Sequence, residues 1–453
     1  MALKIKARNI RIFIMFFLVL ILAMAFAENK HPEQSDPHWN NPQIRVRLVH
    51  TVSSIDLKTH DPFFVKTIQG EKVCTMDKDS SATLSVKNGN LIFKSKAKTM
   101  SIKGLIIESP EPHGILEIKK VPYGVGWWWE GTQDRTYEGR FEIRTNEKNL
   151  LYIVVTLPME DYLRGVVPSE IGSNSPKHAL CAQAVAARSE ALMALATGKY
   201  KGPYHDIGSD VDSQAFSGLV KCSPESDEAI KLTRGHALMF KGKPIAAYYA
   251  SSCGGHTEDI RNVWQHRAHE EAYWDAAVFD GEQSFSYDLS KEQDLRKWLE
   301  DNPKVFCNPK QFDVPQWASK NFRWKREVSQ KDLTAWVAEK KNIGKIKAIK
   351  AIRRGPSGRM IQAEFIGDKG ILTIGPELTI RQVFKPPLKS ASFVVDVEGD
   401  ADLPEKFIIR GAGWGHGVGM CQTGAIAMAN SGKSFHEILA HYYPKARVQK
   451  LYP

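Results

Sequence analysis

The feature that most constrains the fold is an alanine-rich stretch, residues 176–197, which reads PKHALCAQAVAARSEALMALAT. Pro176 suits a first helical position, Gly198 follows the stretch as expected after a helix C-terminus, and Ser175 is the expected cap. At helical spacing one face carries mostly small side chains, which let neighbouring backbone approach closely: Leu180, Ala184, Ala187, Ala191 and Leu195. Gln183 and Arg188 lie near that stripe, where a purely structural surface would not need them.

Strand patterns precede and follow this helix. Residues 44–49 and 139–144 alternate apolar with charged side chains, as half-buried strands do, and residues 151–155 form a continuous apolar run. Residues 158–166 should form a short helix, and residues 244–250 a buried strand. We therefore predict a mixed α+β fold, with a β-rich N-terminal region and the alanine-rich helix beside strands that form a catalytic cleft.

The C-terminal part of the chain carries further turn and cap signals. Strands over 346–352 and 360–365 should form a hairpin through the Gly-Pro-Ser-Gly turn at 355–358. Ser434 and Glu437 have the spacing of a capping box, which predicts a last helix.

The N-terminus predicts export. Four basic residues precede an apolar run, residues 12–27, that closes on Ala25-Phe26-Ala27, a signal-peptidase type of site. An uncleaved anchor is the rival interpretation, although the run is shorter than the roughly 20 apolar residues of a spanning helix. We expect a signal peptide at 1–27, a polar linker at 28–42 and a location in the cell envelope, either periplasm or cell wall.

Charge and cysteine content are consistent with export. The formal net charge is +11, of which four positive charges belong to the predicted signal peptide. A basic exported protein suits an anionic matrix better than a nucleic acid, although lysine-rich loops that keep it soluble explain the charge equally well. Six cysteines leave disulfides, a metal site or buried thiols open.

Three segments could carry chemistry. Glu170 is flanked by Val166, Val167 and Ile171, and apolar surroundings raise a carboxyl pKa as a general acid at neutral pH requires. Residue type alone nevertheless favours a helix-end glutamate that faces water. We expect Glu170 to lie between two helices, and helix-end electrostatics explains Glu160 and Asp161.

The second segment, Ser251 to Glu258, contains Cys253 and His256 at a spacing that can supply two zinc ligands. A third ligand would have to come from His416, Cys222 or Cys421; a nucleophilic thiol with its base and a plain glycine turn are the alternatives. The third segment, residues 411–422, is dense in glycine and presents His416, but it lacks the spacing of a phosphate-binding loop. Trp127-Trp128-Trp129 could stack on sugar rings, although such a run among strands more often packs in a core or at a sheet edge.

Read together, the motifs resemble the SpoIID/LytB family of stage II sporulation protein D and an amidase-modifying protein. The matching stretches are LPMEDYLRGVVPSEI, ALCAQAVAARSEAL, DSQAFSG, YYASSCGGHTEDIRNVW and GAGWGHGVGMCQTGAIAMA, in the family's order. The resemblance implies a lytic transglycosylase that cleaves peptidoglycan glycan strands stripped of their peptides and leaves 1,6-anhydro sugar ends. It places the family's catalytic glutamate on Glu170.

The resemblance also implies supporting residues. Arg188 and Gln183 would face Glu170; Gln214, Ser251, Ser252, Thr257 and His416 would line the cleft; and Cys253 with His256 would hold any zinc. Phe216 stands where relatives often carry tyrosine, and an insertion at about 265–342 is absent from short members. We therefore expect a β-rich region at 43–138 and a SpoIID/LytB-like catalytic domain at 139–453.

Two other function classes stay open. The chain could be a non-catalytic, wall-binding enhancer of an N-acetylmuramoyl-L-alanine amidase, which would make that amidase its partner. It could also be a thiol hydrolase that uses Cys253 with His256 or His416. Peptidoglycan glycan is the expected partner, and nucleic acid is not.

Overall fold

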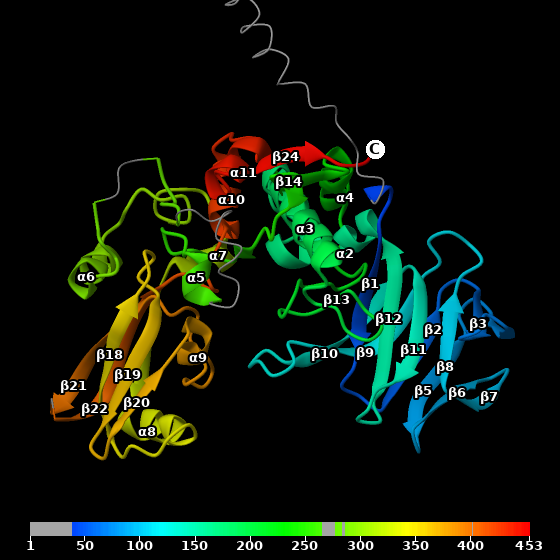
Figure 1. The fold of residues 1–453 in the computed structure, drawn as a ribbon, viewed down its shortest axis with the longest axis horizontal. Helices are drawn as coiled ribbons and strands as arrows, with labels where there is room; N and C mark the ends of the chain where they lie inside the picture. The colour runs from blue at the N-terminus through cyan, green and yellow to red at the C-terminus, as the bar shows by residue number, and fades with distance from the viewer. Residues whose placement is uncertain (1–38, 265–276, 283–285, 401) are drawn as a thin grey trace, which may run out of the picture. The chain divides into compact units, whose positions relative to one another are not determined.

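The computed structural model describes residues 39–264, 277–282, 286–400 and 402–453. The predicted signal peptide and nearly all of the predicted linker lie outside these residues. Residues 41–451 gather into one compact unit, and its fold is α+β, as predicted (Figure 1).

Two β-sheets form the N-terminal part of this unit (Figure 1). The first has the strand order β13-β1-β12-β11-β8-β3-β4 and the second the order β10-β9-β2-β5-β6-β7. The strands of the first are β1 (Gln43–Val49), β3 (Phe63–Thr67), β4 (Lys72–Met76), β8 (Gly104–Glu108), β11 (Arg140–Thr145), β12 (Leu151–Pro158) and β13 (Ile207–Gly208). Those of the second are β2 (Ser54–Thr59), β5 (Ser81–Lys87), β6 (Asn90–Ser95), β7 (Thr99–Ile102), β9 (Leu116–Tyr123) and β10 (Gly131–Tyr137).

The first sheet crosses the boundary that we had placed after residue 138. β11 pairs antiparallel with β8, and β12 pairs antiparallel with β1, so strands from both sides of that boundary share one hydrogen-bonded ladder. The alternating and continuous apolar patterns that predicted β1, β11 and β12 are borne out, because these strands bury their apolar side chains against the rest of the fold.

A layer of helices follows, with α3 (Lys177–Thr197) at its centre (Figure 1). Around α3 pack α2 (Met159–Ile171), α4 (Pro224–Leu232), α10 (Gln422–Asn430), α11 (Phe435–Tyr442) and β14 (His236–Phe240). The alanine-rich sequence permits this, because neighbours pack closely around α3 and every residue from Ala179 to Ala194 is buried. Among the described residues α3 is the one helix long and apolar enough to span a membrane, yet 89% of its most apolar window is buried inside the fold.

The caps of these helices agree only partly with prediction. Gly198 ends α3 in the left-handed conformation, and Ser434 and Glu437 form the predicted capping box of α11. Ser175 does not cap α3: its Oγ donates instead to the carbonyl of Ile171, at the end of α2.

The predicted end of the preceding helix was wrong. α2 continues past Val166 to Ile171 with Pro168 inside it, so Glu170 lies in the last turn of a helix and not between two helices. Proline has no N–H to donate to the carbonyl of Arg164, four residues earlier. That carbonyl accepts the Cys222 thiol instead, at 3.2 Å, which compensates part of the cost of the internal proline.

Short strands complete this layer. β14 pairs with β15 (Lys243–Pro244) and β24 (Arg447–Lys450), and β16 (Tyr249–Ala250) pairs with β23 (Met420–Cys421). The single strand predicted over 244–250 is therefore wrong, although the segment is buried as expected: residues 245–248 form no ladder between β15 and β16. α5 (Ile260–Val263) follows β16 further along the chain.

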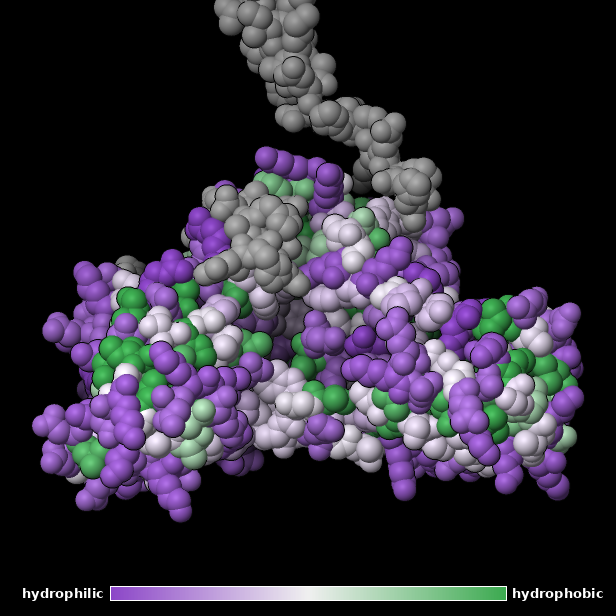
Figure 2. All heavy atoms as spheres, turned by 60° about the horizontal axis from the view of Figure 1, so that its bottom comes forward, coloured by the Kyte–Doolittle hydropathy of each residue, from purple (hydrophilic) through white to green (hydrophobic). Residues whose placement is uncertain are grey.

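The C-terminal part contains two three-stranded sheets, β17-β22-β21 and β18-β19-β20. The predicted hairpin is confirmed as β18 and β19, which pair antiparallel. The elements here are α6 (Glu292–Glu300), α7 (Gln316–Phe322), β17 (Arg323–Ser329), α8 (Gln330–Ala338), β18 (Ile346–Arg354), β19 (Met360–Gly367), β20 (Ile371–Ile374), α9 (Glu377–Arg381), β21 (Phe393–Asp400) and β22 (Leu403–Ala412). Figure 2 shows one face of the molecule, where hydrophilic side chains predominate and apolar ones form separate groups.

Candidate functional site

The Glu170 carboxyl lies where α2 meets the segment after β13. The backbone N–H of Ala215 donates to its Oε1 at 2.7 Å. Part of the side chain reaches solvent, but dense surrounding protein removes most of its hydration and raises the pKa of the carboxyl from 4.5 to about 7. Hydrogen bonds from Ala215, Gln422 and Tyr249 act in the opposite direction without cancelling the effect of burial.

A buried polar chain holds these hydrogen-bond partners in place. The Tyr162 hydroxyl donates to Gln214 Oε1 at 2.9 Å, and Gln214 Nε2 donates to the Tyr249 hydroxyl at 2.9 Å and to the carbonyl of Ala187. Gln214 is thereby fixed by α2, α3 and β16 together. The predicted cleft residue Gln214 thus lies next to the hydroxyl that contacts Glu170.

A cavity of about 530 Å³ opens beside these hydrogen-bonded side chains. Glu170 is not on its wall; Gln214 and Tyr249 are, and the Tyr249 side chain hydrogen-bonds to the Glu170 carboxyl. Much of the rest of the wall is aromatic: Trp127, Trp129, Tyr200, Tyr248, Trp264 and Trp414. Trp127 and Trp129 stack with ring centroids 4.9 Å apart, and they lie on the connection between β9 and β10 and not in a core.

Arg188 has another partner than the one we expected. Its guanidinium forms two hydrogen bonds with the Glu160 carboxylate, at 2.9 and 2.7 Å, and a third with the carbonyl of His236. The side chain is fully buried. The structure therefore places Arg188 opposite Glu160 and not Glu170, and Glu160 serves as the partner of a buried cation more than as a helix-end charge.

Gln183 is connected to Glu170 through one intermediate residue. It is fully buried, and its Oε1 accepts from Gln422 Nε2 at 3.2 Å; the Gln422 side chain in turn hydrogen-bonds to Glu170. Gln183 thus supports the site from within α3 without reaching the cavity wall.

Comparison with known proteins identifies the family. Residues 147–240 match the family described as Stage II sporulation protein, and residues 258–419 match a domain of unknown function (DUF8618). The chain is 30% identical over 305 residues to stage II sporulation protein D of Bacillus amyloliquefaciens, covering 64% of this chain and 74% of that protein. This chain belongs to the stage II sporulation protein D family.

Two further relatives extend the comparison. The amidase enhancer of Bacillus subtilis (strain 168) is 28% identical over 298 residues, which cover 62% of this chain and 39% of the enhancer. An uncharacterized protein of Brachyspira hyodysenteriae is 28% identical over 293 residues, covering 65% of this chain and 67% of that protein. The family resemblance seen in the motifs is thus confirmed.

Of the remaining residues that the family motifs placed in the cleft, only His416 is on the cavity wall. His416 lies on the wall, where burial lowers its pKa to about 3 and keeps it neutral, and its Nδ1 accepts the backbone N–H of Val418. Ser251 accepts from Asn321 Nδ2 at 3.4 Å, Ser252 is fully buried, and Thr257 exchanges hydrogen bonds with the backbone of Val278. None of these last three is on the cavity wall.

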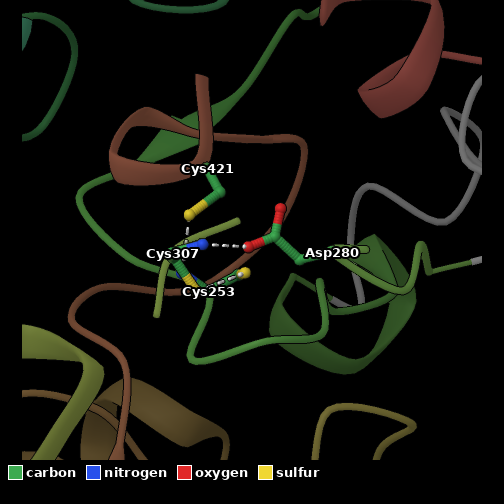
Figure 3. Close-up of side chains that lie close together, drawn as sticks. All are labelled: Cys253, Asp280, Cys307 and Cys421. Carbon is green, nitrogen blue, oxygen red and sulfur yellow. Dashed lines mark hydrogen bonds between the residues drawn. The ribbon is translucent and has the colours of Figure 1, made fainter. Parts of the chain in front are cut away.

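Among the residues that the structure describes, the possible metal ligands grouped with Cys253 do not include His256. His256 Nδ1 is 2.8 Å from the carbonyl oxygen of Thr257. Cys253 instead lies together with Asp280, Cys307 and Cys421, and their ligand atoms are all within 4.8 Å of one another (Figure 3). Cys421, one of the candidates for a third ligand, therefore takes part, whereas Cys222 and His416 do not.

The sequence reasoning missed Tyr249 and Gln422 as neighbours of Glu170. Both were inside quoted family motifs, in YYASSCGG and GMCQTG, but nothing in residue type distinguished them from packing residues. The favoured interpretation of the three tryptophans, core or edge packing, holds only in part: Trp127 and Trp129 stack on one another in the hairpin of the edge strand β10, and they also line the cavity.

Proposed function

We propose that this chain cleaves peptidoglycan glycan strands by a lytic transglycosylase reaction, with the Glu170 carboxyl acting first as acid and then as base. The observation that carries the proposal is the pKa of about 7 that burial gives this carboxyl. At that value both forms are populated near neutral pH, as a group that must first donate and then accept a proton requires.

In the first step protonated Glu170 donates its proton to the glycosidic oxygen, and the bond between that oxygen and the anomeric carbon breaks. In the second step the carboxylate takes the proton of the C6 hydroxyl, whose oxygen bonds to the anomeric carbon and gives a 1,6-anhydro sugar. No water is consumed, and Glu170 ends protonated. Between the steps, the N–H of Ala215 and the hydroxyl of Tyr249 stabilise the carboxylate.

The acids on the cavity wall support a mechanism in which Glu170 is the one reacting carboxyl. Asp212 pairs with Arg47, Glu190 with Lys199, and Glu377 with Arg381. A hydrolase with two carboxylates needs a second one that is available to activate water or attack the sugar. Paired carboxylates are poorly suited to that role, whereas the aromatic side chains around them suit sugar rings.

The test is product analysis in water enriched in oxygen-18. With purified protein and glycan stripped of its peptides, we expect anhydro-ended fragments without the heavy label, identified by mass spectrometry. Glu170→Gln should lower the rate by about 100-fold or more. Glu111→Gln, a change of an exposed glutamate, is the matched control and should have the activity of the unchanged protein. Labelled reducing ends would contradict the proposal in favour of hydrolysis.

A second function is favoured by one relative, the amidase enhancer. In that case the chain would bind the wall and increase cleavage by an N-acetylmuramoyl-L-alanine amidase without cleaving glycan itself. Adding such an amidase to the same assay separates the two: equal enhancement by Glu170→Gln and by the unchanged protein, with no anhydro product from either, would favour the enhancer. Either function places the chain in the cell envelope.

A further inference from the structure

We infer that Cys253, Asp280, Cys307 and Cys421 bind one structural zinc ion. This site goes beyond the proposed glycan cleavage and does not depend on it. Its ligand set also differs from the Cys253–His256 pair that the family resemblance implies, because His256 takes no part. Two of its ligands, Asp280 and Cys307, belong to the insertion that short family members lack.

The four side chains come from three separate parts of the chain (Figure 3). Cys253 follows β16, Asp280 and Cys307 lie in the segment between α5 and α7, and Cys421 precedes α10. Each of the four is at most 2% exposed. Folding therefore removes three thiols and a carboxyl from water and gathers them in one place, where a divalent cation neutralises the charge of their ionised forms.

The spacing of the sulfurs suits a tetrahedral ion. Two thiolates bound to one zinc ion at about 2.3 Å lie about 3.8 Å apart. The Sγ atoms of Cys253 and Cys307 are 3.8 Å apart, much more than the roughly 2.05 Å of a disulfide. Three sulfurs and one carboxylate oxygen make a closed set of four ligands, typical of structural zinc, which leaves no position for substrate.

Surrounding groups orient the ligands as a metal site needs. Backbone N–H groups of Cys253 and Gly424 donate to Cys421 Sγ at 3.2 and 3.3 Å, and that of Gly255 donates to Cys253 Sγ at 3.3 Å. Such bonds stabilise thiolates. The Asp280 carboxylate accepts the Tyr442 hydroxyl at 2.5 Å and the Cys307 N–H at 3.0 Å, which fixes its direction.

Two buried arginines add compensating charge. Arg323 donates to the carbonyl of Gly254, and Arg359 donates to the carbonyl of Cys253. Three thiolates, one carboxylate and one zinc ion together carry two negative charges, and the two guanidiniums balance them in number. The surroundings therefore suit the ionised, metal-bound form of the cluster.

The experiment measures metal in the purified, full-length protein by plasma mass spectrometry. We expect about one zinc ion per chain. Cys307→Ser should lose most of it, and Cys181→Ser, which changes a buried thiol outside the cluster, should keep it. Replacement by Co²⁺ should give the near-ultraviolet charge-transfer absorption of thiolate–cobalt bonds in the unchanged protein and in Cys181→Ser.

Should Cys307→Ser fail to fold, titration of the unchanged protein with a mercurial thiol reagent should release zinc in proportion to the thiols modified. A metal-free protein would overturn the inference, whether peptide mapping then finds a Cys253–Cys307 disulfide or free thiols. A different metal in the cluster would overturn the assignment to zinc. Full zinc content in Cys307→Ser would overturn the inference that Cys307 is one of the ligands.

Discussion

Replacing Glu170 by glutamine should make the protein more stable at alkaline pH while it removes glycan cleavage. The folded protein holds this carboxyl at a pKa of about 7, and the unfolded chain holds it near 4.5. Below pH 4.5 the carboxyl is protonated in both states and contributes nothing to the pH dependence. As pH rises from 4.5 to 7 the unfolded state ionises first, so the native state loses stability; above 7 the penalty is complete.

The size of the penalty follows from the two pKa values. Their difference corresponds to about 3 kcal/mol at alkaline pH. Because part of the Glu170 side chain reaches solvent, screening reduces the effect, and we expect about 1–2 kcal/mol. Glutamine keeps an oxygen that can accept the Ala215 N–H, so the substitution removes the charge without removing that hydrogen bond.

Urea unfolding at about pH 4 and about pH 8 measures the effect through the free energy of unfolding. The free energy of unfolding of Glu170→Gln should exceed that of the unchanged protein at about pH 8 and should be close to it at about pH 4. The exposed control, Glu111→Gln, should show no such pH-dependent gain. If Glu170→Gln is no more stable at about pH 8, or less stable, then burial does not hold a proton on this carboxyl and the acid–base role loses its physical basis.

Two further predictions concern the groups around Glu170. Tyr249→Phe removes a hydroxyl whose hydrogen bond lowers the pKa of Glu170. The alkaline limb of the pH profile of kcat/KM for glycan cleavage should therefore move to higher pH. An unchanged alkaline limb would show that the hydroxyl does not contact the carboxylate. Arg188→Met removes the guanidinium that neutralises buried Glu160, so it should lower the free energy of unfolding in urea by about 3–5 kcal/mol. Adding Glu160→Met to the same chain should restore part of that free energy. A loss below about 1 kcal/mol in Arg188→Met would refute the buried ion pair.

Local patterns in the sequence predicted several individual elements of the secondary structure. The alanine-rich composition of α3, the alternation in β1 and β11 and the turn between β18 and β19 are each properties of neighbouring residues, and each is observed. The extent of α2 was not predictable in this way. Its continuation through Pro168 is supported by the Cys222 thiol, 58 residues away from the Arg164 carbonyl to which it donates.

The site was harder to predict because its chemistry depends on contacts between distant segments. Burial raises the pKa of Glu170, and hydrogen bonds from Ala215, Gln422 and Tyr249, which come from three different parts of the chain, oppose that rise. Arg188 illustrates the same limit: the sequence showed a cation near an apolar stripe, but only the packing of α2 on α3 shows that Glu160 is its partner.

The cysteine cluster and Glu170 are connected through the start of α10. Cys421 precedes this helix and belongs to the cluster, and Gln422, the next residue, hydrogen-bonds to Glu170 and to Gln183. A restraint on Cys421 Sγ therefore also restrains the Gln422 amide, because the backbone between them is fixed by the helix N-terminus. The insertion supplies Asp280 and Cys307 to the same cluster, so it can influence the environment of Glu170 although none of its described residues (277–282 and 286–342) is on the cavity wall.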